Sequence, residues 1–299
     1  MFYLIASALY QVPHFVRPGE TLASSEMQTF PGGKGLNQSV ALGRAGATVI
    51  HGGFIGNNDK WLADILEASK VDIRHLQTVS MPSGHAIIQV DTNGQNCILL
   101  FAGANHCFTL EYVEKALADA ESGDILLLQN EINNLEIVFE IAHAKGMQIA
   151  FNPSPFHKSL LELPLSYVDW WLCNEIEGNE LTGKEDPMDI VTDLCQRFPK
   201  SNVLLTLGKE GSLFKNASKL IRQPAYKTNA VDTTAAGDTF TGYFLAMAAS
   251  GKDIEQALQI ASLASSIAVS KEGTFYPILN ILYIHEVRFP KKSYPPARQ

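Results

Sequence analysis

The 299-residue sequence has few cysteines, a deficit of basic residues and no long apolar run. Its four cysteines show no CxxC spacing and no neighbouring histidines, which argues against a disulfide framework or zinc site and favours reduced thiols in the cytoplasm. No run reaches the roughly 18 apolar residues of a membrane span, so no membrane association is expected. The formal net charge of −8 repels nucleic acid and anionic lipid, so nucleic acid is not an expected partner.

The order of apolar and amphipathic segments predicts an α/β fold in one domain over residues 1–299. No basic residue precedes the apolar opening, so residues 1–10 are interpreted as an edge or first strand rather than a secretory leader. Further along, short apolar strands between amphipathic helices are typical of a mostly parallel sheet covered on both faces, a three-layer α/β/α sandwich. The strands expected there cover residues 124–129, 147–152, 168–173 and 202–207.

Two earlier stretches, about residues 8–31 and 83–101, instead show alternating polarity interrupted by turn residues. The pair Asn93-Gly94 indicates a hairpin. We interpret these stretches as a small accessory sheet beside or over the main one. Ligands of α/β sheets bind beyond the carboxyl ends of the strands, so residues that follow strands are the first candidates for a site.

A glycine-rich segment, residues 31–37, precedes a helix-compatible run. Its glycines let backbone approach a ligand closely. Lys34 and Asn37 add polar groups at a helix N-terminus, where amide donors favour oxygen-rich or anionic ligands. The segment is neither a Walker A loop nor a dinucleotide fingerprint. A turn that only caps a helix would have a similar composition.

A second segment of small residues, 232–238, also leads into a helix. Ala235, Ala236 and Gly237 allow the backbone to wrap an anion, and Asp238 falls in the first helical turn. A carboxylate in that place can deprotonate an alcohol that attacks a phosphoryl group. Ordinary helix capping is the alternative. Two Asp residues beside the small-residue run favour the catalytic interpretation.

Asn174 and Glu177 directly follow the apolar strand at 168–173. They can position a hydrated Mg²⁺ near phosphates, because this ion keeps much of its water shell. An Asn N-cap with Glu at the third helical position explains the spacing equally well. Thr206, Gly208 and Gly211, around the end of the strand at 202–207, have a similar location and the same two interpretations.

Together these segments resemble the ribokinase family of small-sugar kinases. GGKGLNQSVALGRAGA and AVDTTAAGDTFTGYF are similar to the family's N-terminal and C-terminal signatures. Between them FAGAN, LLLQNE, FNPSP, NEIEGNELTG and LLTLGKEGS occur in the family's order, so the resemblance covers residues 17 to about 275. It implies a ribokinase-like fold in which the accessory sheet is a lid that commonly forms a dimer interface, and hence a homodimer.

The resemblance implies an ATP-dependent carbohydrate kinase that phosphorylates the primary hydroxyl of a small sugar, with D-ribose as the expected substrate. A kinase for another sugar or a nucleoside is one alternative. A catalytically weak homologue that binds sugar or nucleotide for regulation is another. The cofactors implied are Mg²⁺ and K⁺, with ATP as co-substrate.

Roles for particular residues follow from the same resemblance. Asp238 is expected to be the catalytic base, and the amides of Ala235, Ala236 and Gly237 to form the anion hole for the transferred phosphoryl group. Glu177 is expected to hold Mg²⁺ through water. The sugar contacts implied are Gly32, Gly33, Lys34, Asn37 and Glu131. The nucleotide contacts implied are Asn174, Glu177, Thr206, Gly208 and Gly211. The potassium site implied comprises Asp232, Thr234, Ala268, Lys271 and Gly273.

The sequence departs from the family pattern at two places. The family usually begins with a strand reading like GSxNxD, whose Asp holds sugar hydroxyls, whereas Ser7 stands near that position here. Loss of a charge-assisted hydrogen bond could weaken sugar binding by about 1.5–3 kcal/mol. After Gly273, residues 274–277 replace a more polar run, which leaves one potassium contact unaccounted for.

Overall fold

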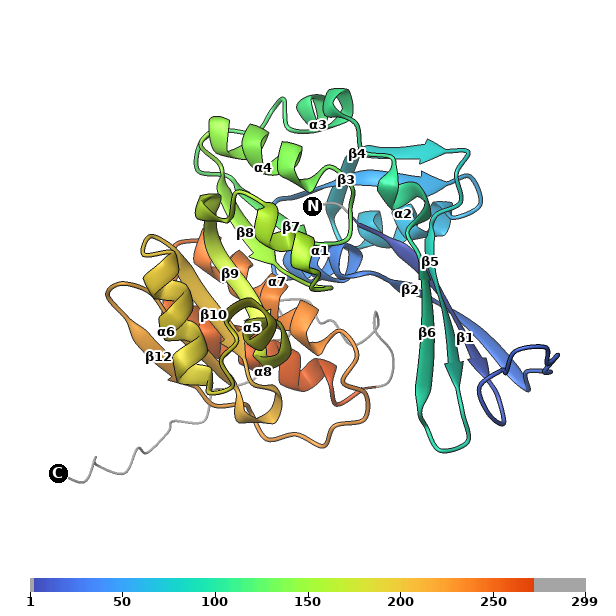
Figure 1. The fold of residues 1–299 in the computed structure, drawn as a ribbon. Coiled ribbons are helices and arrows are strands. Elements are labelled where there is room, and N and C mark those ends of the chain that lie inside the picture. Colours follow the sequence, from blue (N-terminus) through green and yellow to red (C-terminus); the bar gives the residue numbers. More distant parts are fainter. Residues whose placement is uncertain (1–2, 272–299) are drawn as a thin grey trace.

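The computed structural model describes residues 3–271 of the chain (Figure 1). Its largest sheet has six strands in the order β12-β11-β10-β9-β8-β7. The strands from β7 to β10 run parallel to one another, and β11 and β12 are antiparallel additions at one edge. The strands are β7 (Ile125–Gln129), β8 (Gln148–Asn152), β9 (Val168–Asn174), β10 (Asn202–Thr206), β11 (Ser212–Lys215) and β12 (Leu220–Gln223).

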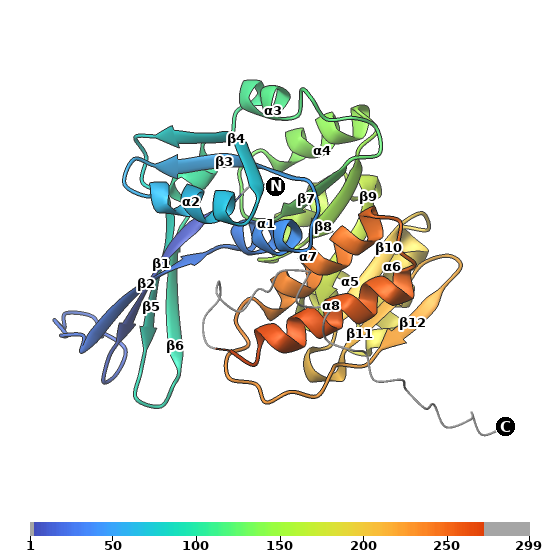
Figure 2. The same ribbon diagram turned by 180° about the vertical axis from the view of Figure 1, so that it is seen from behind.

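Helices cover both faces of this sheet (Figures 1 and 2). Side chains alternate along a strand, so Leu126 and Leu128 of β7 join the core on one face while Leu127 joins the core on the other. The first core includes α3 (Leu110–Ala116), α4 (Leu135–Ala144), α5 (Glu175–Thr182) and α6 (Pro187–Arg197). The second includes α1 (Lys34–Arg44), α2 (Lys60–Ala68), α7 (Ala236–Ala249) and α8 (Ile254–Ala268). The predicted three-layer α/β arrangement is confirmed.

Two further strands form a small parallel sheet of their own. They are β3 (Val49–Gly56) and β4 (Val71–Val79), connected through α2. No strand in the described part of the chain joins this pair to β7, so the sheet system is interrupted between β7 and β3. The sequence pattern did not predict this interruption.

The predicted accessory sheet has four strands in the order β2-β1-β5-β6 and projects from the body of the molecule (Figures 1 and 2). Its strands are β1 (Ile5–Gln11), β2 (Glu26–Gly32), β5 (Gly84–Val90) and β6 (Asn96–Phe101). The hairpin expected at Asn93-Gly94 connects β5 to β6. The first strand, β1, is not an edge strand, because β2 pairs with one side of it and β5 with the other.

Helices α1 and α7 pack closely against each other at Gly242. A Cβ at this position would collide with the Cβ of Ala41 and would lie 3.0 Å from the carbonyl oxygen of Gln38. Only a glycine lets the two backbones approach this far. The contact matters for function because α1 and α7 carry the two sequence signatures.

We therefore expect Gly242→Ala to force α1 and α7 apart and to lower the free energy of unfolding by about 1–3 kcal/mol, the usual cost of overpacking. Urea denaturation measures this loss. Gln256→Ala, on the exposed side of α8, is the control, and it should change stability by less than about 0.5 kcal/mol. Equal stability of Gly242→Ala and the unmodified chain would show that the helix contact is not tight.

Candidate active site

Residues from both sequence signatures meet at the carboxyl ends of the parallel strands. Asn152 ends β8, Asn174 ends β9 and Thr206 ends β10, and all three line one cavity of about 40 Å³. Lys34 of α1, Glu177 of α5, and Gly237 and Asp238 of α7 line the same cavity. The edge of the sheet expected from the strand pattern therefore brings together residues that are distant in the sequence.

Asp238 is buried in the first turn of α7, and both of its carboxylate oxygens accept hydrogen bonds from α1. Asn37 Nδ2 donates to Oδ2 at 3.0 Å, and Gln38 Nε2 donates to Oδ1 at 2.8 Å. Gln38 Oε1 in turn accepts from Gln129 Nε2 at 2.6 Å. This chain of amides fixes the orientation of the carboxylate.

The helix end that carries Asp238 is open to the cavity at Gly237. Ala235 adopts the left-handed conformation with φ 57°, and no side chain caps the helix. The amide of Ala236 donates to the carbonyl of Thr233 at 3.2 Å. Gly237 lines the cavity, and a Cβ there would meet nothing within 4 Å. Of the three residues expected to form the anion hole, Gly237 is thus the one best placed to face a ligand.

Lys34 lies among three carboxyl groups. Burial lowers the pKa of Lys34, but the charges of Asp238, Glu177 and Glu131 together outweigh burial and raise it. Burial also raises the pKa of Glu131 to about 8, an effect that the positive charge of Lys34 opposes and that Asp238 strengthens. The backbone amide of Lys34 donates a hydrogen bond to the Glu131 carboxyl group.

Tyr3 is a neighbour of this site that the sequence did not indicate. Its hydroxyl hydrogen-bonds the Glu131 carboxyl group. Its ring covers Gly33, where an added Cβ would lie 2.9 Å from Tyr3 Cδ1. Ser7 lies on β1, two residues after Ile5. Its side chain faces Gly32, because a Cβ added to Gly32 would lie 2.7 Å from Ser7 Oγ. Ser7 therefore stands beside the glycine-rich segment, and its place in the sugar site stays a prediction.

Several buried acceptors around Asp238 have no donor. Within the described part of the chain, Asn37 Oδ1, Gln129 Oε1 and Glu131 Oε2 are buried and lack hydrogen-bond partners. Buried polar atoms in folded proteins are almost always paired. A ligand with several hydroxyl donors would satisfy these acceptors.

On the opposite side of the cavity, Asn174 and Glu177 form a capping box. Asn174 Oδ1 accepts from the Glu177 amide at 2.9 Å, and Glu177 Oε2 accepts from the Asn174 amide at 3.0 Å. Asn152 Nδ2 also donates to Glu177 Oε2 at 3.2 Å. The capping interpretation of the pair is confirmed, and the capping box positions Glu177 in the wall of the cavity, where its magnesium role stays a prediction. Both of the bonds that the Glu177 carboxylate accepts end on Oε2.

The two glycines expected at the nucleotide site differ. Gly208 has no atom within 4 Å of an added Cβ, so backbone is accessible there. At Gly211 an added Cβ would collide with the carbonyl oxygen of Gln223. Gly211 also has φ 100° and its carbonyl accepts from the Leu207 amide, so the structure uses it to close the turn before β11.

The segment expected to hold potassium is attached to the end of α8. The amides of Val231 and Asp232 donate to the carbonyl of Val269 at 2.7 and 3.2 Å, close to Ala268 and Lys271 in the chain. Asp232 Oδ1 accepts from the amide of Thr234 at 2.8 Å. Gly273 and residues 274–277 lie outside the described residues. No group of three or more His, Cys, Asp or Glu residues between positions 3 and 271 forms a metal site.

Two glutamine side chains of the site, Gln38 and Gln129, were given no role by the sequence. Gln38 lies in the first signature and Gln129 in the LLLQNE match, so a signal was present in each motif. In the part of the chain that the structure covers, no helix is long and apolar enough to cross a membrane.

The chain is similar to known proteins over nearly its whole length. The family described as "pfkB family carbohydrate kinase" matches residues 3–280. A ribokinase of Haemophilus influenzae is 35% identical over 279 residues, which are 90% of each chain. A deoxyribokinase of Salmonella typhimurium is 31% identical over 272 residues, 86% of this chain and 87% of that protein. The structure of Arabidopsis thaliana ribokinase complexed with ribose and ATP superposes with a TM-score of 0.83 at 27% identity, covering 95% of this chain and 96% of that one.

The raised pKa of Glu131 predicts a pH-dependent stability. Its pKa in the fold, about 8, exceeds the ordinary value of 4.5, so its contribution is complete below pH 4.5 and is lost as the pH rises through 8. Between pH 5 and pH 8, the unmodified chain should therefore lose unfolding free energy relative to Glu131→Gln, which cannot ionise. Urea denaturation at several pH values measures the difference. Glu136→Gln, an exposed carboxyl group of α4, is the control, and parallel pH curves for Glu131→Gln and the unmodified chain would contradict the assignment.

Proposed function

Because the chain belongs to the pfkB family of carbohydrate kinases, as its sequence predicted, we propose that it transfers the terminal phosphoryl group of ATP to the primary hydroxyl of D-ribose. The observation that carries this proposal is the set of three buried acceptors without donors, Asn37 Oδ1, Gln129 Oε1 and Glu131 Oε2, near the Asp238 carboxylate. A polyhydroxylated sugar supplies the missing donors. The similarity to ribokinases supports ribose among small sugars.

In this proposal Asp238 is the general base. The primary hydroxyl donates to its carboxylate, which takes the proton as the hydroxyl oxygen bonds to the phosphorus and the bond to the nucleoside diphosphate breaks. Asn37 and Gln38 hold the carboxylate in place. Gly237, at the N-terminal end of α7, offers its amide to the phosphoryl oxygens, and Lys34 supplies a half-buried positive charge.

The residues of the nucleotide side fit a hydrated Mg²⁺. Glu177 lines the cavity and is buried, and the two hydrogen bonds that its carboxylate accepts both end on Oε2. A single carboxylate near phosphates is the usual protein share of a magnesium site, because the ion keeps several waters. When bound, the ion would neutralise phosphate charge. Thr206 and Gly208 would lie along the nucleotide.

We also propose a potassium site at the loop that precedes α7. The loop from Asp232 to Thr234 is attached to the end of α8, and it leads directly into the helix end that faces the cavity. A fixed cation there would preorganise that helix end for the developing negative charge. Activity in a potassium salt should exceed activity in the salt of a bulky organic cation, and equal rates would reject the site.

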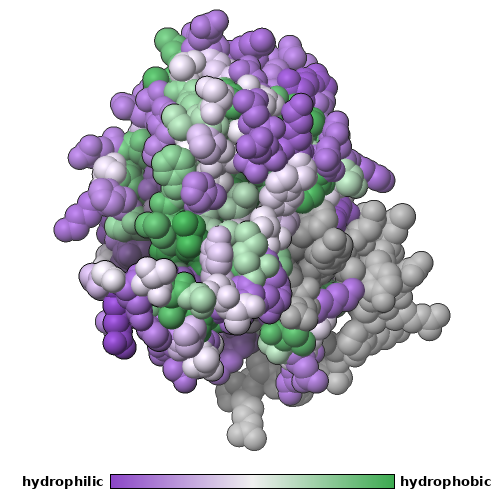
Figure 3. All heavy atoms as spheres, turned by 90° about the vertical axis from the view of Figure 1, so that its right-hand side faces the viewer, coloured by the Kyte–Doolittle hydropathy of each residue, from purple (hydrophilic) through white to green (hydrophobic). Residues whose placement is uncertain are grey.

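A homodimer through the accessory sheet is the proposed assembly. Strand β6 exposes Ile98, Leu99 and Leu100, which are 52%, 67% and 55% accessible. Figure 3 views the molecule from the side of this sheet and shows apolar side chains exposed among polar ones. Monomers rarely leave such a patch uncovered. Sedimentation of the unmodified chain should show a dimer, and the substitution Leu99→Glu should dissociate it. If the unmodified chain sedimented as a monomer, the proposed dimer would be rejected.

Asp238→Asn should lower kcat by at least about 100-fold, because an amide cannot take the proton of the sugar hydroxyl. A coupled assay for ADP measures the rate, and calorimetry with ADP should show nearly unchanged nucleotide binding. A screen of ribose, 2-deoxyribose, other pentoses and nucleosides with ATP and Mg²⁺ tests the substrate. If the enzyme preferred a nucleoside or 2-deoxyribose, that compound would replace ribose as the proposed substrate. Absence of turnover with every acceptor would favour a regulatory homologue.

Ser7→Asp should lower the KM for ribose by about tenfold or more, since an ionised acceptor beside Gly32 strengthens hydrogen bonds from sugar hydroxyls. The KM for ATP should change little. Ala8→Asp is the matched control, because successive side chains of β1 point to opposite faces of the sheet. An unchanged or higher KM for ribose in Ser7→Asp would show that residue 7 does not contact the sugar.

A further inference from the structure

A buried asparagine that does not line the active-site cavity, Asn105, holds the backbone of Leu4. Asn105 Oδ1 accepts from the Leu4 amide at 3.1 Å, and Asn105 Nδ2 donates to the Leu4 carbonyl oxygen at 2.7 Å. Both residues are fully buried. One side chain therefore satisfies both backbone groups of a residue that lies 101 positions away in the sequence.

The clamp acts immediately before β1. Pairing of β1 with β2 and with β5 begins at Ile5, the residue after Leu4. Buried backbone groups must be hydrogen-bonded. The Asn105 amide supplies at Leu4 the two bonds that neighbouring strands supply further along β1. Loss of this amide would leave two buried backbone groups unpaired and would release the start of the strand.

Asn105 is itself fixed in place. It lies in the turn η1 (Gly103–His106), where Gly103 has φ 52° and an added Cβ would collide with the carbonyl oxygen of Pro82. A Cβ on Gly84 would collide with Asn105 Nδ2, so the missing side chain of that glycine makes room for the amide. The clamp is therefore a rigid connection between this turn and the start of β1.

The residues on either side of Leu4 contact the glycine-rich segment. A Cβ added to Gly33 would lie 2.9 Å from Tyr3 Cδ1 and 3.2 Å from the Ile5 nitrogen. The Tyr3 hydroxyl also bonds to the Glu131 carboxyl group. Tyr3 has φ 149°, a conformation that side chains rarely adopt, so surrounding contacts must hold it there.

We propose that Asn105 is a positioning residue of the sugar site. By holding Leu4, it keeps Tyr3 against the glycine-rich segment and against Glu131. Among the described residues, Glu131 Oε2 is buried without a hydrogen-bond partner, and the fixed tyrosine keeps this acceptor in place for a sugar hydroxyl. The inference rests on the proposed sugar kinase function, in which Glu131 contacts the sugar. Because Asn105 stands outside the active-site cavity, its loss should weaken sugar binding more than phosphoryl transfer.

Asn105→Ala removes both bonds to Leu4. It should raise the KM for ribose by about tenfold or more, because the start of β1 no longer fixes the Glu131 carboxyl group. The kcat should fall by less than about threefold, and the KM for ATP should stay unchanged, which is the pattern of lost sugar binding alone. Steady-state kinetics with ribose and ATP varied in turn measures these values.

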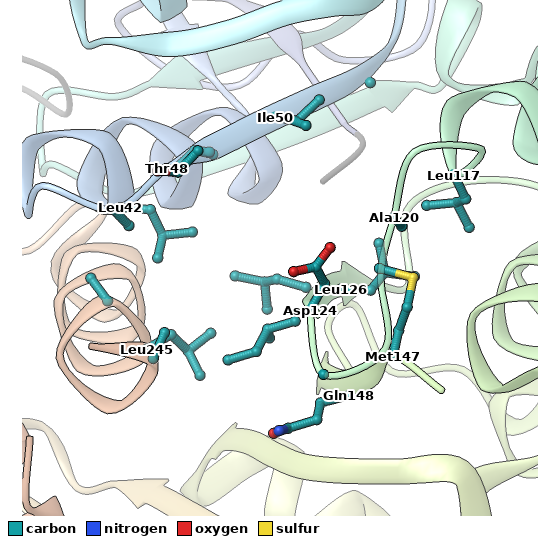
Figure 4. A pocket seen from close by; sticks show the side chains of 18 of the residues that line it. Leu42, Thr48, Ile50, Leu117, Ala120, Asp124, Leu126, Met147, Gln148 and Leu245 are labelled. Carbon is teal, nitrogen blue, oxygen red and sulfur yellow. The ribbon is translucent and has the colours of Figure 1, made fainter. Parts of the chain in front are cut away.

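Gln148→Ala is the matched control, since it also replaces a side-chain amide with a methyl group. It removes the acceptor of a 2.8 Å bond from Trp170 Nε1. Gln148 lies in the wall of a cavity of about 540 Å³ at the amino ends of β7 and β8, shown in Figure 4. None of the described residues in that wall lines the active-site cavity. This variant should lose stability and keep the KM for ribose.

A double-mutant cycle with Tyr3→Phe separates positioning from a general loss of stability. Phenylalanine keeps the ring over Gly33 but cannot bond to Glu131. If Asn105 acts through this bond, Asn105→Ala should change the KM for ribose by less than about threefold in the Tyr3→Phe background. Additive effects of the two substitutions would overturn the proposal.

Asn105→Asp provides a second, conservative variant. Burial raises the pKa of a carboxyl group, and the protonated form again offers one donor and one acceptor to Leu4. Relative to the unmodified chain at the same pH, its KM for ribose should therefore recover as the pH falls from about 8 to about 6. A ratio of KM values that does not change with pH would count against the clamp.

An unchanged KM for ribose in Asn105→Ala, or an equal rise in Gln148→Ala, would also overturn the proposal. In these cases the unmodified chain still phosphorylates ribose, so the proposed function stands. Failure of the proposed function gives a different result, because the unmodified chain would then show no turnover with any sugar, and both proposals would be rejected.

Discussion

The hydrogen bonds from Asn37 and Gln38 to Asp238 are the interaction on which the site depends. They connect two signatures that are about 200 residues apart in the sequence. They form only because Gly242 lets α7 approach α1 closely. Gln129 extends the same network from β7, so the orientation of one carboxylate depends on two helices and a strand. A small loss of packing between the helices would therefore change the chemistry before it unfolded the protein.

The charged and polar groups gathered at this site lower the stability of the fold. Lys34, Glu131, Glu177 and Asp238 are placed close together in a region that excludes much of the solvent, and the raised pKa of Glu131 records the cost of burying a carboxylate there. Unpaired buried acceptors add to that cost. The fold offsets it with the two extensive apolar cores on either side of the sheet. Hydrogen bonds from the hydroxyl groups of a bound sugar would offset part of this cost, and that gain would add to the binding free energy.

The sequence predicted the charged and glycine-rich parts of the site better than its glutamines. Asp238, Lys34 and Glu177 were found because charges at the start of helices, after apolar strands, are unusual and have a direct chemical meaning. Gln38 and Gln129 were missed because a glutamine side chain within a helix or strand carries no comparable signal until its partner in space is known. Gly211 shows that a glycine in a motif can also be required by the turn itself, because the structure uses it to close the turn before β11. The order of the strands in the sheets could not be predicted either, because polarity patterns identify strands but not their neighbours.

The accessory sheet connects the sugar site to the surface expected to associate. Strand β2 ends at Gly32 and pairs with β1, which carries Ser7, and β1 pairs in turn with β5. Beyond β5 lies β6 with its exposed apolar side chains. Two strands, β1 and β5, thus lie between the strand that carries Gly32 and the apolar edge, and backbone hydrogen bonds link each strand to the next. A partner that fixes β6 would therefore restrain the backbone of β1 and β2, which carry Ser7 and Gly32, so the proposed association and the proposed sugar binding would favour each other.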